Sequence, residues 1–197
     1  MKDAPAGPIV CLGDSIAAAG WPAVLETRLR EAGWTNVRCV NAGVRGNTST
    51  QGLRRLEKDV LAHQPALVLV QFGFNDCNVV LNGPRPRTLK EDFRKNLIVI
   101  ADRTEETGAS VILIANHRTL MHRILPDGRP YEEHSQEYTA VVAQLAVEME
   151  VPCIDMREEF PGPGILLADA LDEDGIHLSP VGIACYAQIV AGFLLER

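Results

Sequence analysis

The sequence is poor in three things that particular protein classes need: aromatic residues, an excess of positive charge, and long hydrophobic runs. Aromatic residues make up only 5% of the 197, so a core must consist mainly of valine, leucine, isoleucine and alanine. The 19 lysines and arginines are outnumbered by 26 aspartates and glutamates, for a net charge of −7. Because phosphate binding needs clustered basic side chains, we expect no nucleic-acid partner.

No apolar stretch is long enough to cross a bilayer, and the N-terminal segment has no apolar run of signal-peptide length. These absences predict no membrane insertion and a cytoplasmic location, with a mature secreted form left open. The five cysteines are odd in number and none lies in a Cys-x-x-Cys pair, which favours reduced thiols. No zinc-binding spacing and no glycine-rich nucleotide loop occurs, so we expect neither a catalytic metal nor a bound nucleotide.

Apolar runs alternate with helical periods along the whole chain, which has 46% hydrophobic and 23% charged residues. Continuous apolar runs without polar alternation are typical of strands that are covered on both faces of a parallel sheet. We therefore predict a single α/β domain over 1–197, with helices on both sides of a five-stranded parallel sheet. The predicted strands are 9–12, 37–40, 66–70, 111–115 and 151–154.

The predicted helices follow from apolar spacing and from capping residues. Leu53, Leu56 and Val60 mark one helix. Thr88 and Glu91 have the Thr-x-x-Glu spacing of a capping box that opens another. Ser179 followed by Pro180 predicts the start of the last helix, near 180–195. Two connections, 76–88 and 116–133, are longer than usual, and we expect them to build a pocket.

Polar residues gather where the predicted strands end. Gly13-Asp14-Ser15 follows the first strand, Asn41-Ala42-Gly43 follows the second, and Gly73-Phe74-Asn75-Asp76 follows the third. Asp174-Gly175-Ile176-His177 precedes the last helix. Ligands bind at the carboxyl ends of the strands in an open parallel sheet. We therefore expect these segments to meet at one edge.

Together these residues supply what acyl transfer needs. Ser15 is the predicted nucleophile, His177 the base that takes its proton, and Asp174 the acceptor that orients the imidazole. The predicted oxyanion donors are the N–H groups of Ser15 and Gly43 and the side-chain amide of Asn75. Asp14 is expected to tie the turn beside the nucleophile by hydrogen bonds, and Gly73 to support the loop that carries Asn75.

The set Ser15, Gly43, Asn75 and Asp174-x-x-His177 resembles the SGNH (GDSL-like) hydrolase family, and the resemblance spans almost the whole chain. It implies a flavodoxin-like three-layer α/β/α fold, a catalytic triad of Ser15, His177 and Asp174, and no metal or organic cofactor. Ile16 stands where the family's name has leucine. The Gly-x-Ser-x-Gly elbow of the α/β-hydrolases is absent.

The resemblance implies a small-molecule ester as substrate, and we favour a short acyl or O-acetyl group. Polar loops around Arg85, Arg87, Arg118 and Arg123, with no apolar lid, point away from long lipid chains. A thioesterase, a lysophospholipase, an acyltransferase and a non-catalytic binding module stay open as alternatives. His117 and His122 are expected in a solvated loop, or else in contact with substrate. The oligomeric state cannot be predicted.

Overall fold

Five parallel strands form one sheet in a computed structural model that describes residues 4–79 and 85–196. The strand order is β2-β1-β3-β4-β5, and every neighbouring pair is parallel. This confirms the predicted fold class. Residues 80–84, inside the predicted connection 76–88, lie outside the described residues. The strands are β1 (Ile9–Gly13), β2 (Cys39–Gly43), β3 (Leu67–Gln71), β4 (Ser110–Ala115) and β5 (Cys153–Asp155).

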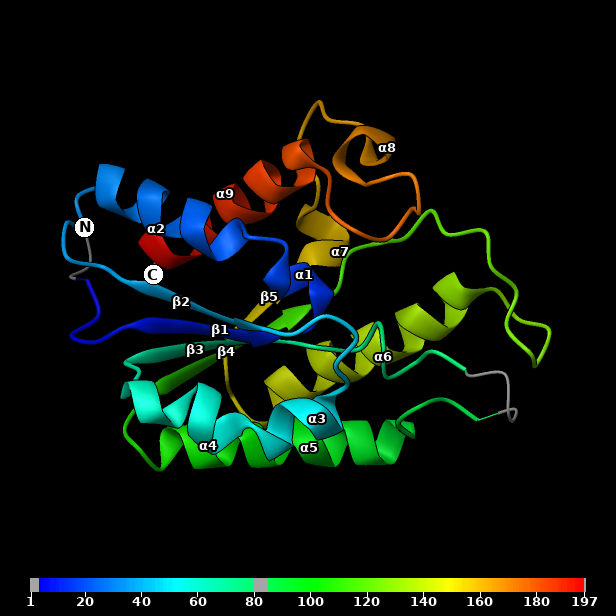
Figure 1. The fold of residues 1–197 in the computed structure, drawn as a ribbon, viewed down its shortest axis with the longest axis horizontal. Helices are drawn as coiled ribbons and strands as arrows, with labels where there is room; N and C mark the ends of the chain where they lie inside the picture. Colours follow the sequence, from blue (N-terminus) through cyan, green and yellow to red (C-terminus); the bar gives the residue numbers. More distant parts are fainter. Residues whose placement is uncertain (1–3, 80–84, 197) are drawn as a thin grey trace.

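Helices cover both faces of the sheet and give the molecule three layers (Figure 1). On one face lie α1 (Ser15–Ala18), α2 (Trp21–Glu31) and α9 (Pro180–Glu196), with α2 packed against α9. On the other face lie α3 (Ser49–Arg54), α4 (Leu56–Asp59), α5 (Lys90–Glu105) and α6 (Tyr131–Glu148), with α5 packed between α3 and α6. Shorter turns are η1 (Leu61–His63), α7 (Met156–Glu159) and α8 (Leu167–Ala170). No helix in the described part of the chain has the length and apolar character to span a membrane.

Helix α9 begins as predicted, because Ser179 Oγ accepts a hydrogen bond from the N–H of Gly182 at 3.1 Å. The capping box predicted at Thr88 is wrong: α5 begins at Lys90, with Leu89 as its N-cap residue. The backbone of Thr88 is used elsewhere, since its N–H donates to the carbonyl of Asp76 at 3.1 Å. A capping box does form at α3, where Gln51 Oε1 accepts the N–H of Thr48 at 2.9 Å.

The helix predicted through Leu53, Leu56 and Val60 is interrupted. Arg55 separates α3 from α4, and its backbone φ of −104° departs from helical geometry. The break aims the Arg55 side chain at the sheet instead of along a helix surface. That side chain contacts the ends of β1 and β2, which lead into the predicted site.

The carboxyl ends of β1, β2 and β3 lie in register. Gly13 pairs with Gly43 on one side and with Gln71 on the other. The segments that follow these three strands therefore start at the same edge, as expected. The described parts of the connections after β3 and β4 extend beyond that edge (Figure 1).

Candidate active site

Ser15, His177 and Asp174 are joined by hydrogen bonds at the carboxyl edge of the sheet. Ser15 Oγ lies 2.9 Å from His177 Nε2, and His177 Nδ1 lies 2.5 Å from Asp174 Oδ2. The serine comes from the end of β1, whereas the histidine and aspartate come from the segment before α9. A serine in contact with an imidazole whose other nitrogen bonds a carboxylate is the arrangement that activates a hydroxyl for acyl transfer.

Local hydrogen bonds hold the turn from Asp174 to His177. Asp174 Oδ1 accepts the N–H groups of Ile176 at 3.0 Å and of His177 at 2.9 Å. Partial burial raises the pKa of Asp174, but the hydrogen bonds from the His177 ring and these N–H groups outweigh it and hold that pKa below its ordinary value. The carboxylate therefore stays ionised and can stabilise an imidazolium at His177.

The same turn is packed against the connection after β4. The N–H of Leu120 donates to the carbonyl of Gly175 at 2.7 Å. Gly175 has a φ of +72°, and a Cβ there would lie 2.7 Å from the carbonyl carbon of Leu120. Only glycine fits this conformation and this close approach. The connection 116–133 thus supports the site through backbone contacts.

His117 is wholly buried, so the prediction that it lies in a solvated loop is wrong. Its ring packs against those of Phe74 and Phe160, each with a centroid separation of 5.0 Å. His117 Nε2 lies 3.0 Å from the carbonyl oxygen of Ile176, the residue before His177. His122, by contrast, is exposed. His117 therefore contacts the backbone that leads into His177.

Two of the predicted oxyanion donors lie on the segments that follow β1 and β3. Ser15 is the first residue of α1, where no carbonyl of the helix can reach its N–H. Asn75 follows β3, and its Nδ2 lies 3.4 Å from Asp14 Oδ2. Asn75 Oδ1 accepts a hydrogen bond from Arg87 at 3.4 Å, so the amide is oriented from both ends.

Gly43 has a different environment from the predicted one. Its N–H donates to Asn41 Oδ1 at 2.9 Å, so the group already has an acceptor. A Cβ at Gly43 would lie only 2.3 Å from the backbone nitrogen of Ala18, which shows that the glycine lets β2 approach α1. Packing is therefore the observed role of Gly43.

Gly46 lies further along the same connection and has a free N–H within the described part of the chain. The segment that holds it is fixed at both ends: Val44 N–H donates to the Gly13 carbonyl at 3.1 Å, and Ser49 N–H donates to Asp76 at 2.9 Å. It thus runs from the end of β1 to the loop of Asn75. Gly46 has a φ of +76°, and no atom outside the adjacent residues lies within 4 Å of the position of a Cβ.

Arg55 ties the first two strand ends together, which the sequence did not predict. Its guanidinium donates to the carbonyls of Gly13 at 2.8 Å and Ala42 at 2.6 Å, and its Nε donates to Asn47 at 2.9 Å. Burial lowers the pKa of Arg55, although its ion pair with Asp59 opposes that effect. Nothing in the sequence distinguishes this arginine from a surface residue of a helix.

Two buried aspartates and a glycine support the site. Asp14 accepts the N–H of Ile16 at 2.9 Å, as expected of a residue that ties the turn. Burial raises the pKa of Asp14 to about 7, and the nearby charge of Asp76 adds to this. Asp76 accepts the hydroxyl of Ser49 at 2.7 Å. At Gly73, φ is +133° and a Cβ would lie 2.9 Å from Asn116 Nδ2.

The fold has three layers, and its parallel sheet holds a serine, a histidine and an aspartate in contact at the carboxyl edge. This is the architecture of an ester-cleaving hydrolase. A model of the GDSL-like lipase/acylhydrolase family matches residues 11–184. The chain belongs to this family. Within the described residues, no group of three or more histidine, cysteine, aspartate or glutamate side chains is placed to hold a metal ion.

Relatives with curated names are similar over most of the chain. One is the thioesterase 1/protease 1/lysophospholipase L1 of Escherichia coli, 33% identical over 187 residues, which cover 90% of this chain and 78% of that protein. Another is the esterase TesA of Pseudomonas aeruginosa, 35% identical over 152 residues, which cover 73% and 69%. A crystal structure of a lipase/acylhydrolase from Enterococcus faecalis matches with a TM-score of 0.81 at 28% identity and covers 97% of this chain and 96% of that one. The chain is therefore an ester-cleaving hydrolase of the GDSL family.

Proposed function

We propose that this protein is a serine esterase that forms an acyl-enzyme on Ser15. The observation that carries the proposal is the contact of 2.9 Å between Ser15 Oγ and His177 Nε2, with Asp174 on the other nitrogen of the ring. Oγ attacks the ester carbonyl carbon while Nε2 takes its proton. The imidazolium then gives that proton to the leaving alkoxide. Water, deprotonated by His177, attacks the acyl group and releases Ser15.

The negative charge that develops on the carbonyl oxygen needs donors already in place. Ser15 N–H and Asn75 Nδ2 are two of them in this proposal. For the third we propose Gly46 N–H instead of Gly43 N–H, because Asn41 already accepts the latter at 2.9 Å. A crystal structure of the enzyme with a phosphonate on Ser15 tests this choice. The phosphoryl oxygen should lie within hydrogen-bond distance of Gly46 N; the same distance to Gly43 N would restore the sequence-based assignment.

The substrate we propose is a carboxylic ester with a short acyl chain or an O-acetyl group. Arg85, Arg87, Arg118 and Arg123 stand on the two connections beside the site, and polar surroundings disfavour long alkyl chains. A thioester is a second candidate, since the relative from Escherichia coli is named a thioesterase. A chain-length series from acetyl to octanoyl, run with oxygen and sulfur esters, separates these. A clear preference for octanoyl would contradict the short-chain proposal.

The nucleophile is tested with p-nitrophenyl acetate. We compare the wild type with Ser15→Ala and with Ser110→Ala, a control at an exposed serine of β4. The proposal expects turnover by the wild type and the control, and none by Ser15→Ala. Equal turnover by all three proteins would remove Ser15 from the reaction. The cytoplasmic location and the single-domain organisation stay predictions from the sequence.

A further inference from the structure

A basic groove on the side of α3 and α5 is lined by Arg87, whose guanidinium contacts Asn75. It has a volume of about 450 Å³ and lies between the segment 85–89 and the first half of α5. We use the name basic groove for this cavity. Its cationic side chains are those of Arg85, Arg87 and Lys95, and Thr50 and Asn96 contribute polar atoms to the wall.

The charges in the basic groove are poorly compensated. Its one acidic lining residue is Asp92, which lies 3.9 Å from Lys95 at the limit of an ion pair. Arg87 contacts two neutral amide oxygens, Asn75 Oδ1 at 3.4 Å and Gln51 Oε1 at 3.5 Å. Arg85 forms no ion pair with any residue that the structure describes. This local excess of positive charge stands in a protein whose net charge is −7.

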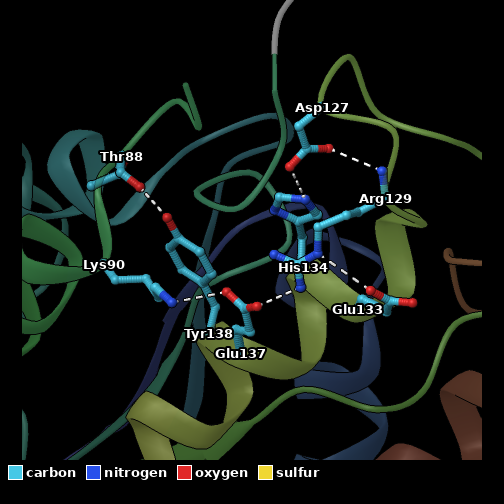
Figure 2. A network of polar contacts seen from close by, with 8 residues as sticks. All are labelled: Thr88, Lys90, Asp127, Arg129, Glu133, His134, Glu137 and Tyr138. Carbon is cyan, nitrogen blue, oxygen red and sulfur yellow. Dashed lines mark hydrogen bonds and ion pairs between the residues drawn. The ribbon is translucent and has the colours of Figure 1, made fainter. Parts of the chain in front are cut away.

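Arg87 is held in place by its backbone. Its N–H donates to the carbonyl of Asn78 at 2.9 Å, and the next residue, Thr88, donates to Asp76. Figure 2 shows how the segment that follows is fastened to α6: Tyr138 donates its hydroxyl to the Thr88 carbonyl, and Lys90 pairs with Glu137 at 2.9 Å. Lys90 is thus neutralised. Arg87 lines the groove and forms no ion pair with a described carboxylate, although its charge acts on the buried Asp76.

The position of the basic groove indicates which half of the ester it can contact. His177 must protonate the leaving alkoxide, so the alcohol half of an ester lies toward the imidazole. Arg87 contacts the oxygen of the Asn75 amide, the end opposite to the Nδ2 that faces Asp14. Arg87 therefore links the basic groove to a proposed oxyanion donor, and an acyl half that points away from the imidazole can extend toward it. A guanidinium matches a carboxylate in shape and forms two parallel hydrogen bonds with it.

We propose that the basic groove binds a carboxylate at the far end of the acyl chain, so that the preferred substrate is a monoester of a short dicarboxylic acid. This inference rests on the proposed function, in which Ser15 attacks the ester. Arg87 and Arg85 bind the free carboxylate, and the charge of Lys95 adds to the positive electrostatic potential in the groove. A neutral acyl chain of the same length offers these cations no carboxylate to bind.

The test compares monoethyl glutarate with ethyl pentanoate, which differ by a terminal carboxylate in place of a methyl group. The measured quantity is the ratio of the two kcat/KM values, the acyl ratio. We expect an acyl ratio above one for the wild type, and a fall of about three- to tenfold in Arg87→Gln, carried mainly by KM. Arg85→Gln and Lys95→Gln should lower it by smaller factors. Any change in the Asn75 amide affects both substrates and cancels in the acyl ratio.

Arg103→Gln is the matched control, because it removes the same charge from the last turn of α5, where Arg103 pairs with Glu57 at 2.7 Å. Its acyl ratio should equal that of the wild type.

A second pair of substrates tests whether the groove binds an anion on the alcohol half instead. We compare the hydrolysis of 4-acetoxybenzoate with that of its methyl ester, which lacks the free carboxylate. A wild-type acyl ratio of one or less, an acyl ratio that the groove variants leave unchanged, or an effect confined to the acetoxybenzoate pair overturns the proposal. Hydrolysis of ethyl pentanoate by Ser15→Ala would instead contradict the proposed function.

Discussion

The buried imidazole of His117 hydrogen-bonds the carbonyl of Ile176, which belongs to the peptide group that leads into His177. The Nε2–oxygen distance is 3.0 Å, and because a carbonyl only accepts, Nε2 carries the proton. Nδ1 has no hydrogen-bond partner within the described residues. Burial lowers the pKa of His117 to about 4, so the ring is neutral near pH 7. We infer that His117 positions the base without taking part in proton transfer.

The first prediction separates the hydrogen bond of His117 from its packing. His117→Gln can place an amide N–H near the Ile176 carbonyl, whereas His117→Leu leaves that buried acceptor unpaired. We expect His117→Leu to lower kcat by about tenfold with little change in KM, and His117→Gln to recover part of the loss. Steady-state kinetics on p-nitrophenyl acetate check this, with thermal unfolding as the measure of stability. Equal kcat values for the two variants would show that only packing matters.

The second prediction concerns the Asn75 amide. Asn75→Ala removes one donor to the developing oxyanion and should lower kcat by about 100- to 1000-fold. Asn78→Ala, at a residue of the same loop outside the proposed oxyanion donors, serves as the control for general effects on the loop. Circular dichroism confirms that each variant is folded. A folded Asn75→Ala protein with the wild-type rate would exclude Asn75 from the site.

The third prediction follows from the raised pKa of Asp14, about 7 in the folded protein against an ordinary value of 3.8. A carboxyl whose pKa rises on folding binds protons more tightly in the folded state. Its cost to stability is absent below the unfolded-state pKa, grows as the pH rises between the two values, and is complete above about 7. Asp14→Asn keeps an acceptor for the Ile16 N–H and removes that cost.

We therefore expect the free energy of unfolding of Asp14→Asn, relative to the wild type, to increase from pH 4 to pH 8. Urea denaturation at several pH values measures it. Asp169→Asn, at an exposed aspartate, controls for the loss of one negative charge. If the difference between wild type and Asp14→Asn is the same at both ends of the range, Asp14 does not titrate as the structure indicates.

The fourth prediction addresses the bridge that Arg55 makes between two strand ends. A lysine has the charge but cannot reach the Gly13 and Ala42 carbonyls together, because it lacks the planar fork of a guanidinium. We expect Arg55→Lys to lower the free energy of unfolding by about 1–3 kcal/mol. We also expect it to lower kcat by more than this loss of stability explains. Arg54→Lys, at the neighbouring position in α3, is the matched control. A variant that keeps full kcat would limit Arg55 to a structural role.

The sequence predicted most of the sheet because buried parallel strands leave a simple signal. Residues 9–12, 66–70 and 111–115 are continuous apolar runs, and each lies within or nearly coincides with an observed strand. The second strand was placed at 37–40 but spans Cys39–Gly43, since its last residues are small or polar and pair by backbone alone. Pairing of that kind depends on a neighbouring strand and cannot be predicted from the segment itself.

The site was partly predictable for a related reason. Ser15, Asn75 and His177 lie at positions that the order of strands and helices already defines. The environment of Gly43 depends on one side-chain contact, with Asn41, which no spacing rule encodes. His117 follows an apolar run among polar neighbours, a pattern typical of exposed loops. Its burial results from rings that are distant in the sequence, such as Phe160.

The backbone around the nucleophile contains two glycines at positions with no room for a side chain. A Cβ at Gly13 would lie 2.8 Å from the carbonyl of Gln71, and one at Gly43 would lie 2.3 Å from the nitrogen of Ala18. Mutational libraries at these two positions should therefore return almost only glycine. Changes of substrate range have to come from the connections at the rim, so that selection can alter which ester is accepted without disturbing how Ser15 reacts.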